Sequence, residues 1–227
     1  MTNSLQLLSN ALNEKPSLAL SFYSFGAVMT QRKGEAICEY AVDPTQIAQA
    51  LSAKVVFDTG ILSENTILLR QEGVKKTIVE YRPAQKTGLF VEGSETAIRI
   101  PLPPLVLIRT SQQQQPDYQF FAVKQRPTLT SELFVAPFPN VNSHGSICWG
   151  TVRQVHDQAS SAALTHDWAV LLGSPFGDHS CSSKSKKFPR DIRRQWMALE
   201  QRKARRYPVS DLVSAKTTLA QVLGEKA

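Results

Sequence analysis

The sequence of 227 residues contains no long apolar run. Its most apolar stretch, Pro101–Ile108, is interrupted by prolines and is far shorter than the roughly 18 residues that a membrane-spanning helix needs. The first residues also lack the basic segment, apolar segment and small-residue cleavage site of a secretory signal. These absences predict a cytoplasmic protein that does not use a membrane as a partner.

Cysteine and histidine are scarce as well, with three and four residues respectively. The cysteines, Cys38, Cys148 and Cys181, are odd in number, widely separated and not accompanied by histidines at the spacing of zinc ligands. This pattern argues against a disulfide framework and a zinc site, and we expect no metal or organic cofactor. Each thiol is therefore interpreted by itself, as a small buried side chain or as a nucleophile.

Acidic residues are fewer than basic ones, and the formal net charge is +7. The excess is confined to residues 184–206, where ten basic and two acidic residues give +8 and leave the remainder of the chain at −1. Any binding of nucleic acid or another polyanion is therefore expected in this segment. A helix with a solvated basic face is the simpler interpretation of the same residues.

The composition, with 42% hydrophobic and 20% charged residues, is that of a folded protein. Apolar runs predict strands over 18–23 and 36–42, and Asp43 followed by Pro44 predicts the start of a helix over 44–53. Short segments bounded by turn residues then predict an antiparallel meander, over residues 77–82, 88–92, 96–100, 105–110 and 119–124. Helices are predicted over 159–172, around Trp196 and over 210–223.

These elements predict an α+β fold in which an antiparallel meander packs against helices. We expect three parts along the chain. Residues 1–76 form an N-terminal α/β addition packed on the core, residues 77–183 form the core, and residues 184–227 form a basic helical C-terminal extension.

The stretch Pro137–Trp149 is rich in turn residues and follows the apolar strand Leu133–Val135. Cys148 is therefore predicted to lie in a loop that leaves a sheet. A thiol in such a loop can be partly exposed and polarised by nearby amides, whereas a thiol in mid-strand is usually inert. Cys148 is the candidate nucleophile, since Cys38 lies in a strand pattern that favours a buried thiol, and Cys181, beside serines, is expected to be exposed without a role.

The same stretch resembles the active-site region of ubiquitin-conjugating enzymes, in which His-Pro-Asn precedes a glycine-containing turn, a small or β-branched residue and the catalytic cysteine. The residues in register with this signature are Pro139, Asn140, Gly145, Ile147 and Cys148. The family's histidine is replaced by Phe138. Because that histidine is usually given a structural role, its replacement bears on loop geometry more than on chemistry.

Two further segments are similar to the family. Residues 98–108 look like the proline-rich strand connection before the active-site loop, and residues 168–178 are similar to the crossover helix and its acidic exit. The resemblance is closest to the prokaryotic branch, family D, that is found in PRTRC plasmid cassettes. It implies that residues 77–183 are a ubiquitin-conjugating-enzyme-like catalytic core.

The resemblance also implies a role for each motif residue. Cys148 would carry a modifier as a thioester, since only a thiolate attacks an activated acyl group fast enough. Asn140 would donate its side-chain amide to the oxyanion that forms when an amine attacks this thioester. Pro139 and Gly145 would shape the loop, and Asp178 would help to desolvate or deprotonate the incoming lysine.

The function that follows from the resemblance is that of a transferase which accepts a ubiquitin-like modifier from a ThiF-type activating enzyme. A JAB-type peptidase is implied as a further partner. Two alternatives remain open. The first is a non-catalytic adaptor of the same fold that binds partners or nucleic acid through residues 184–206. The second is a cysteine hydrolase that uses Cys148 and His144 as a dyad.

Overall fold

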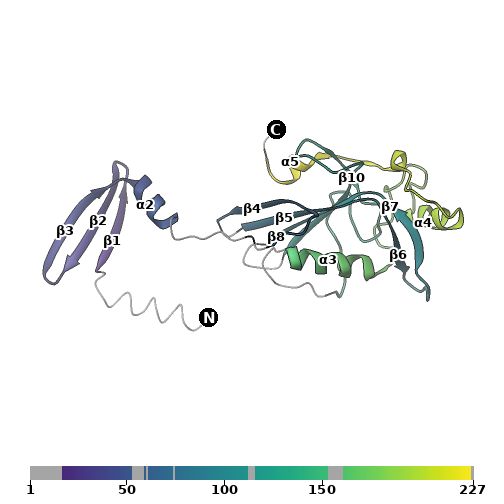
Figure 1. Cartoon of the computed structure of the whole chain (residues 1–227), viewed down its shortest axis with the longest axis horizontal. Helices are drawn as coiled ribbons and strands as arrows, with labels where there is room; N and C mark the ends of the chain where they lie inside the picture. Colours follow the sequence, from purple (N-terminus) through teal and green to yellow (C-terminus); the bar gives the residue numbers. More distant parts are fainter. Residues whose placement is uncertain are drawn as a thin grey trace. The chain divides into compact units, whose positions relative to one another are not determined.

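A computed structural model describes residues 17–52, 59, 61–73, 75–111, 116–152 and 161–225 (Figure 1). The chain forms two compact units, residues 1–58 and residues 59–227. Within the described ranges, no helix combines the length and the apolar character that crossing a membrane requires.

The first unit is a three-stranded antiparallel sheet followed by a helix. In spatial order the strands are β1 (Leu18–Tyr23), β2 (Gly26–Lys33) and β3 (Ala36–Val42), and the helix is α2 (Pro44–Ser52). Asp43 begins the helix, because its carboxylate accepts the Thr45 N–H at 2.8 Å. The two predicted strands and the predicted helix are confirmed, whereas the central strand β2 was not predicted.

The second unit is built on a six-stranded antiparallel sheet. In spatial order its strands are β12 (Ser214–Thr218), β10 (Glu132–Val135), β9 (Asp117–Ala122), β8 (Leu105–Ser111), β5 (Lys75–Arg82) and β4 (Thr66–Glu72). Strand β4 corrects the predicted boundary of the N-terminal addition at residue 76. It pairs with β5 along its whole length and so belongs to this sheet, because the buried strand β5 needs partners on both edges.

This unit also contains a smaller sheet and the helices α3 (Ser161–Gly173) and α4 (Ile192–Gln201). The smaller sheet contains the hairpin of β6 (Gln85–Val91) and β7 (Ile98–Leu102), with the short strand β11 (Pro175–Phe176) parallel to β6. Helix α3 packs against β5 and β6, and helix α4 packs against β7 (Figure 1). The five predicted strands are confirmed as β5 to β9, but they do not form one continuous meander, because β5 pairs with β8 while β6 and β7 belong to the smaller sheet.

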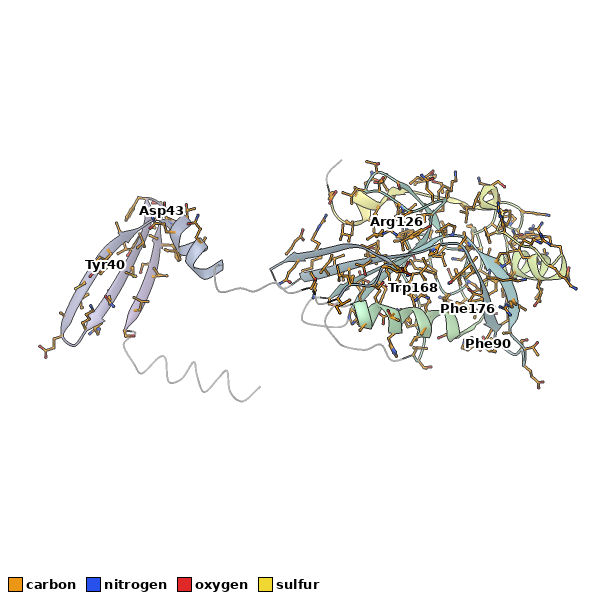
Figure 2. The ribbon with its side chains drawn as sticks, viewed as in Figure 1. Tyr40, Asp43, Phe90, Arg126, Trp168 and Phe176 are labelled. Atoms are coloured by element: carbon orange, nitrogen blue, oxygen red, sulfur yellow. The ribbon has the colours of Figure 1, made fainter. Side chains whose placement is uncertain are left out.

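Two apolar clusters cover the two faces of the large sheet, because successive side chains of a strand point to opposite faces. The cluster that includes α3 contains Ile78, Leu107, Phe120 and Trp168. The cluster on the other face includes the short helix α5 (Leu219–Val222) and contains Val79, Val106, Phe121 and Leu219. Figure 2 shows Trp168 and Phe176 inside the second unit.

Residues 184–225 are part of the second unit and do not form an extension of it. Trp196 and Leu199 of α4 have no exposed surface, and Leu212 is equally buried. The predicted helix over 210–223 is wrong for most of its length, since the chain forms a 3₁₀ turn, strand β12 and the four residues of α5 there. The reason is the free edge of β10, where pairing with β12 outweighs the apolar spacing that suggested a helix.

Candidate active site

The loop that carries Cys148 leaves β10 and is folded on itself by one asparagine. The side-chain oxygen of Asn142 accepts the N–H groups of His144 and Ser146 at 2.9 and 3.0 Å. Its main-chain oxygen accepts the Gly145 N–H at 3.1 Å. An asparagine that accepts from residues further along the chain closes a compact turn, so this loop has a defined shape.

This turn packs against β9. One edge of β9 pairs with β8, and the opposite edge pairs partly with β10 and partly with the loop. β10 pairs with the C-terminal end of β9. Further along the same edge, the Phe120 N–H donates to the Gly145 carbonyl at 2.8 Å, and Gln119 pairs with Ser146. β10 and the loop therefore form one continuous row of pairings along β9, so the sheet fixes the position of the loop.

Gly145 lies at the closest approach between the loop and the sheet. Its φ of +85° belongs to a region that residues with a side chain rarely adopt. A Cβ at this position would lie 2.6 Å from the Cζ atom of Phe121. Both observations require a glycine here, which supports the loop-shaping role expected of Gly145.

Asn140 connects the two sides of the site through its main chain. Its N–H donates to the His179 carbonyl at 2.9 Å, and its carbonyl accepts the Cys148 N–H at 2.6 Å. Its φ of 63° is left-handed, a conformation that asparagine tolerates better than most residues. Within the described part of the chain, no hydrogen bond engages its side-chain amide, which can therefore donate to a ligand.

The three cysteines differ in exposure, and the prediction that Cys181 is exposed is wrong, because its side chain belongs to the buried core cluster. Cys148 is exposed, Cys38 is half-buried in β3, and Cys181 is buried. Burial raises the pKa of the Cys181 thiol, which disfavours its thiolate. Cys148 is thus the cysteine best placed to meet a macromolecular substrate.

Cys148 lines an open groove of about 390 Å³. Asn140 and Asp178 line the same groove, so the structure brings together the three residues for which the sequence predicted chemistry. Asp178 is exposed and follows β11. His144, the partner of Cys148 in the alternative dyad, is exposed in the turn and is not among the residues that line this groove.

Two further titratable side chains line the groove and were not predicted, His179 and Glu92. The Glu92 N–H donates to the Phe176 carbonyl at 3.0 Å, which ties this end of β6 to β11. The absence of a side chain at Gly177 makes room for Glu92, since a Cβ there would lie 2.6 Å from its Oε2 atom. The one sequence signal for His179 is its position next to Asp178. The groove therefore combines an exposed thiol with two carboxylates and an imidazole.

An aromatic cluster supports the base of the loop. Phe138 has no exposed surface, and its ring centroid lies 5.2 Å from Phe120, 5.5 Å from Phe176 and 5.7 Å from Trp196. The Trp196 indole N–H donates to the Pro137 carbonyl at 3.0 Å. The position of the family's histidine is therefore filled by an apolar ring that packs in the core, and the polar contact to the loop comes from Trp196.

A buried lysine holds the other end of this segment. The ammonium of Lys184 donates to the Val141 carbonyl, which also accepts the Ser180 hydroxyl at 3.2 Å. Only 1% of Lys184 is exposed, and burial lowers its pKa to about 8. Trp196 and Lys184 thus donate hydrogen bonds to the carbonyls of Pro137 and Val141, the first and last residues of this segment.

Comparison with known proteins identifies the family. Residues 44–215 match the model of prokaryotic E2 family D, where E2 denotes a ubiquitin-conjugating enzyme. The match spans most of the chain, and the chain belongs to this family. No curated protein and no solved structure matches it.

Proposed function

We propose that this chain accepts a ubiquitin-like modifier from an activating enzyme as a thioester on Cys148 and passes it to an acceptor amine. The observation that carries the proposal is the shared groove, in which the exposed thiol of Cys148 lies with Asn140 and Asp178. Membership in a prokaryotic E2 family supports the same class of reaction. The activating enzyme that fits this chemistry is of the ThiF type.

In the charging step, the Cys148 thiolate attacks the carbonyl carbon of the modifier's thioester on the activating enzyme. A new carbon–sulfur bond forms, the old one breaks, and the sulfur of the activating enzyme leaves as a thiolate. The hydrogen bond from the Cys148 N–H to the Asn140 carbonyl fixes the main chain at the reacting residue.

In the discharge step, an acceptor amine attacks the thioester carbonyl, and a tetrahedral oxyanion forms. The free side-chain amide of Asn140 donates to this oxyanion. The carbon–sulfur bond then breaks, Cys148 leaves as a thiolate, and the proton of the amine passes to the Asp178 carboxylate. The negative charges of Asp178 and Glu92 in the groove also attract a cationic lysine.

The test is a charging assay that contains ATP, a ThiF-type activating enzyme and the modifier, followed by electrophoresis with and without a thiol reductant. The wild-type chain should form an adduct that the reductant removes. Cys148→Ser should form a reductant-resistant oxyester or no adduct. Cys38→Ser and Cys181→Ser are the matched controls and should charge as the wild type does.

Each other outcome points to a different function. A reducible adduct on Cys148→Ser would place the thioester on another cysteine. A folded wild-type chain that never charges would support the adaptor alternative. Hydrolysis of a modifier thioester without ATP and activating enzyme, with loss of turnover in His144→Ala, would support the hydrolase alternative.

A further inference from the structure

A second groove, of about 370 Å³, lies between β6, β7 and the chain that follows α4. Four basic residues line it, Lys86 of β6, Lys124 after β9, and Arg205 and Arg206 after α4. All four are exposed, and no acidic residue lines the groove. Segments far apart in sequence therefore place four positive charges around one concavity.

These charges have little internal compensation. None of the four residues takes part in the ion pairs formed within the described ranges, which involve Arg70, Arg109 and Arg193. Lys124 lies 4.7 Å from the ring of Phe134, and this is a weak contact for an exposed ammonium. Four like charges around one concavity repel one another, and an anion that enters it relieves this repulsion.

The floor of the groove is apolar and preformed. Pro101, Leu102, Pro103 and Pro104 are buried, and so is Tyr207. The side chain of Tyr207 is only 5% exposed, so its ring offers no face on which a base could stack. A ligand of this groove is therefore held by charge around its rim and by shape at its floor.

The positive charge continues beyond the groove on both sides along the chain. Lys186 donates to the Ser210 carbonyl at 3.2 Å, which places this exposed lysine next to the wall formed by Val209. At the other end, Arg202 and Lys203 are exposed just before Arg205. This flanking charge adds to the long-range attraction of an extended polyanion toward the groove, where the four cations make the contacts.

We infer that this groove binds the phosphodiester backbone of a nucleic acid, without sequence preference. A backbone supplies regularly spaced negative charges for the four cations, and the buried Tyr207 offers no ring on which a base could stack. An acidic peptide is the competing ligand, but carboxylates do not match the two guanidinium groups of Arg205 and Arg206 better than phosphates do. The site is independent of Cys148, which lines the other groove.

The experiment measures binding of labelled single-stranded DNA and of its duplex to the full chain by fluorescence anisotropy. With four phosphate contacts, affinity should fall roughly 50-fold for the single strand and roughly 150-fold for the duplex between about 50 and 200 mM salt. Replacing Lys86, Lys124, Arg205 and Arg206 together by glutamine should remove this salt dependence. Arg205→Gln with Arg206→Gln alone should remove about half of the slope.

The matched control removes the same charge at residues that do not line the groove, with Arg32, Lys33, Lys75 and Lys216 replaced by glutamine. It should bind DNA as the wild type does, and both quadruple variants should keep the wild-type thermal melt and charging at Cys148. Absent DNA binding at about 50 mM salt, or equal losses in the two quadruple variants, would overturn the inference. Binding of polyglutamate but not DNA through the four residues would overturn it in favour of an acidic peptide.

Discussion

Lys184 allows a quantitative test of how the active-site loop is held. Its ammonium donates to the Val141 carbonyl, and no carboxylate pairs with it in the described part of the chain. Burial disfavours the charged form and lowers its pKa from 10.5 to about 8. Lys184→Met keeps much of the side-chain volume and removes the titrating group.

The sign of the pH dependence follows from this shift. Between pH 8 and 10.5 the unfolded chain retains the Lys184 proton while the folded chain has lost it, so the free energy of unfolding rises with pH. From about pH 7.5 to 9, the two pKa values give a gain of about 1 kcal/mol. For a domain of this size the gain raises the melting temperature by roughly 3 °C.

The assay is urea unfolding followed by tryptophan fluorescence at both pH values, in the wild type and in Lys184→Met. Burial also raises the pKa of Tyr118 and Tyr207, which are the same in both proteins, and the two proteins are compared in a Cys181→Ser background because Lys184 lowers the pKa of Cys181. The difference between the two pH dependences therefore isolates Lys184. Lys186→Met, at an exposed lysine, is the control. Equal pH dependence in wild type and Lys184→Met would refute the reasoning.

Two further predictions concern the loop itself. Asn140→Ala and Asn140→Gly should both charge nearly normally but discharge to an amine on the order of 10²-fold more slowly in single-turnover assays, because both lack the oxyanion donor. A defect in the alanine variant alone would instead indicate strain at the φ of 63°. Gly145→Ala should lower the free energy of unfolding by about 2 to 4 kcal/mol in urea titrations, because it combines a positive φ with a clash against Phe121. An additional Phe121→Leu should restore part of this loss, and an unchanged midpoint in Gly145→Ala would contradict the packing.

The sequence was most informative where local pattern decides structure. Turn-bounded apolar segments located the strands from β5 to β9, because alternation and turn residues act over a few positions. The register from Asn140 to Cys148 located the loop, and the structure brings both residues to one groove with Asp178. The roles of these residues remain predictions until discharge is measured.

The features of the fold and of the site that the sequence did not predict depend on contacts between segments far apart in sequence. Glu92 reaches the groove because β11 pairs with β6. A parallel strand of two residues is too short for any hydrophobic periodicity in the sequence to predict it. Lys184 lies in a run of serines and lysines that is typical of a solvated segment, yet its side chain is buried against the loop. Strand β12 forms at the free edge of β10, which the residues of β12 do not themselves reveal.

The segment after Ser183 therefore serves both grooves, and a deletion cannot separate them. Removing it would take away Lys184 and Trp196, which bind the active-site loop, and would also remove Arg205 and Arg206 from the basic groove. Loss of charging after such a deletion would follow from an unsupported loop, whatever the basic groove binds. Point substitutions do separate the two, because Arg205 and Arg206 are exposed while Lys184 and Trp196 are buried. A chain that loses DNA binding but still charges at Cys148 would establish that the two grooves act independently.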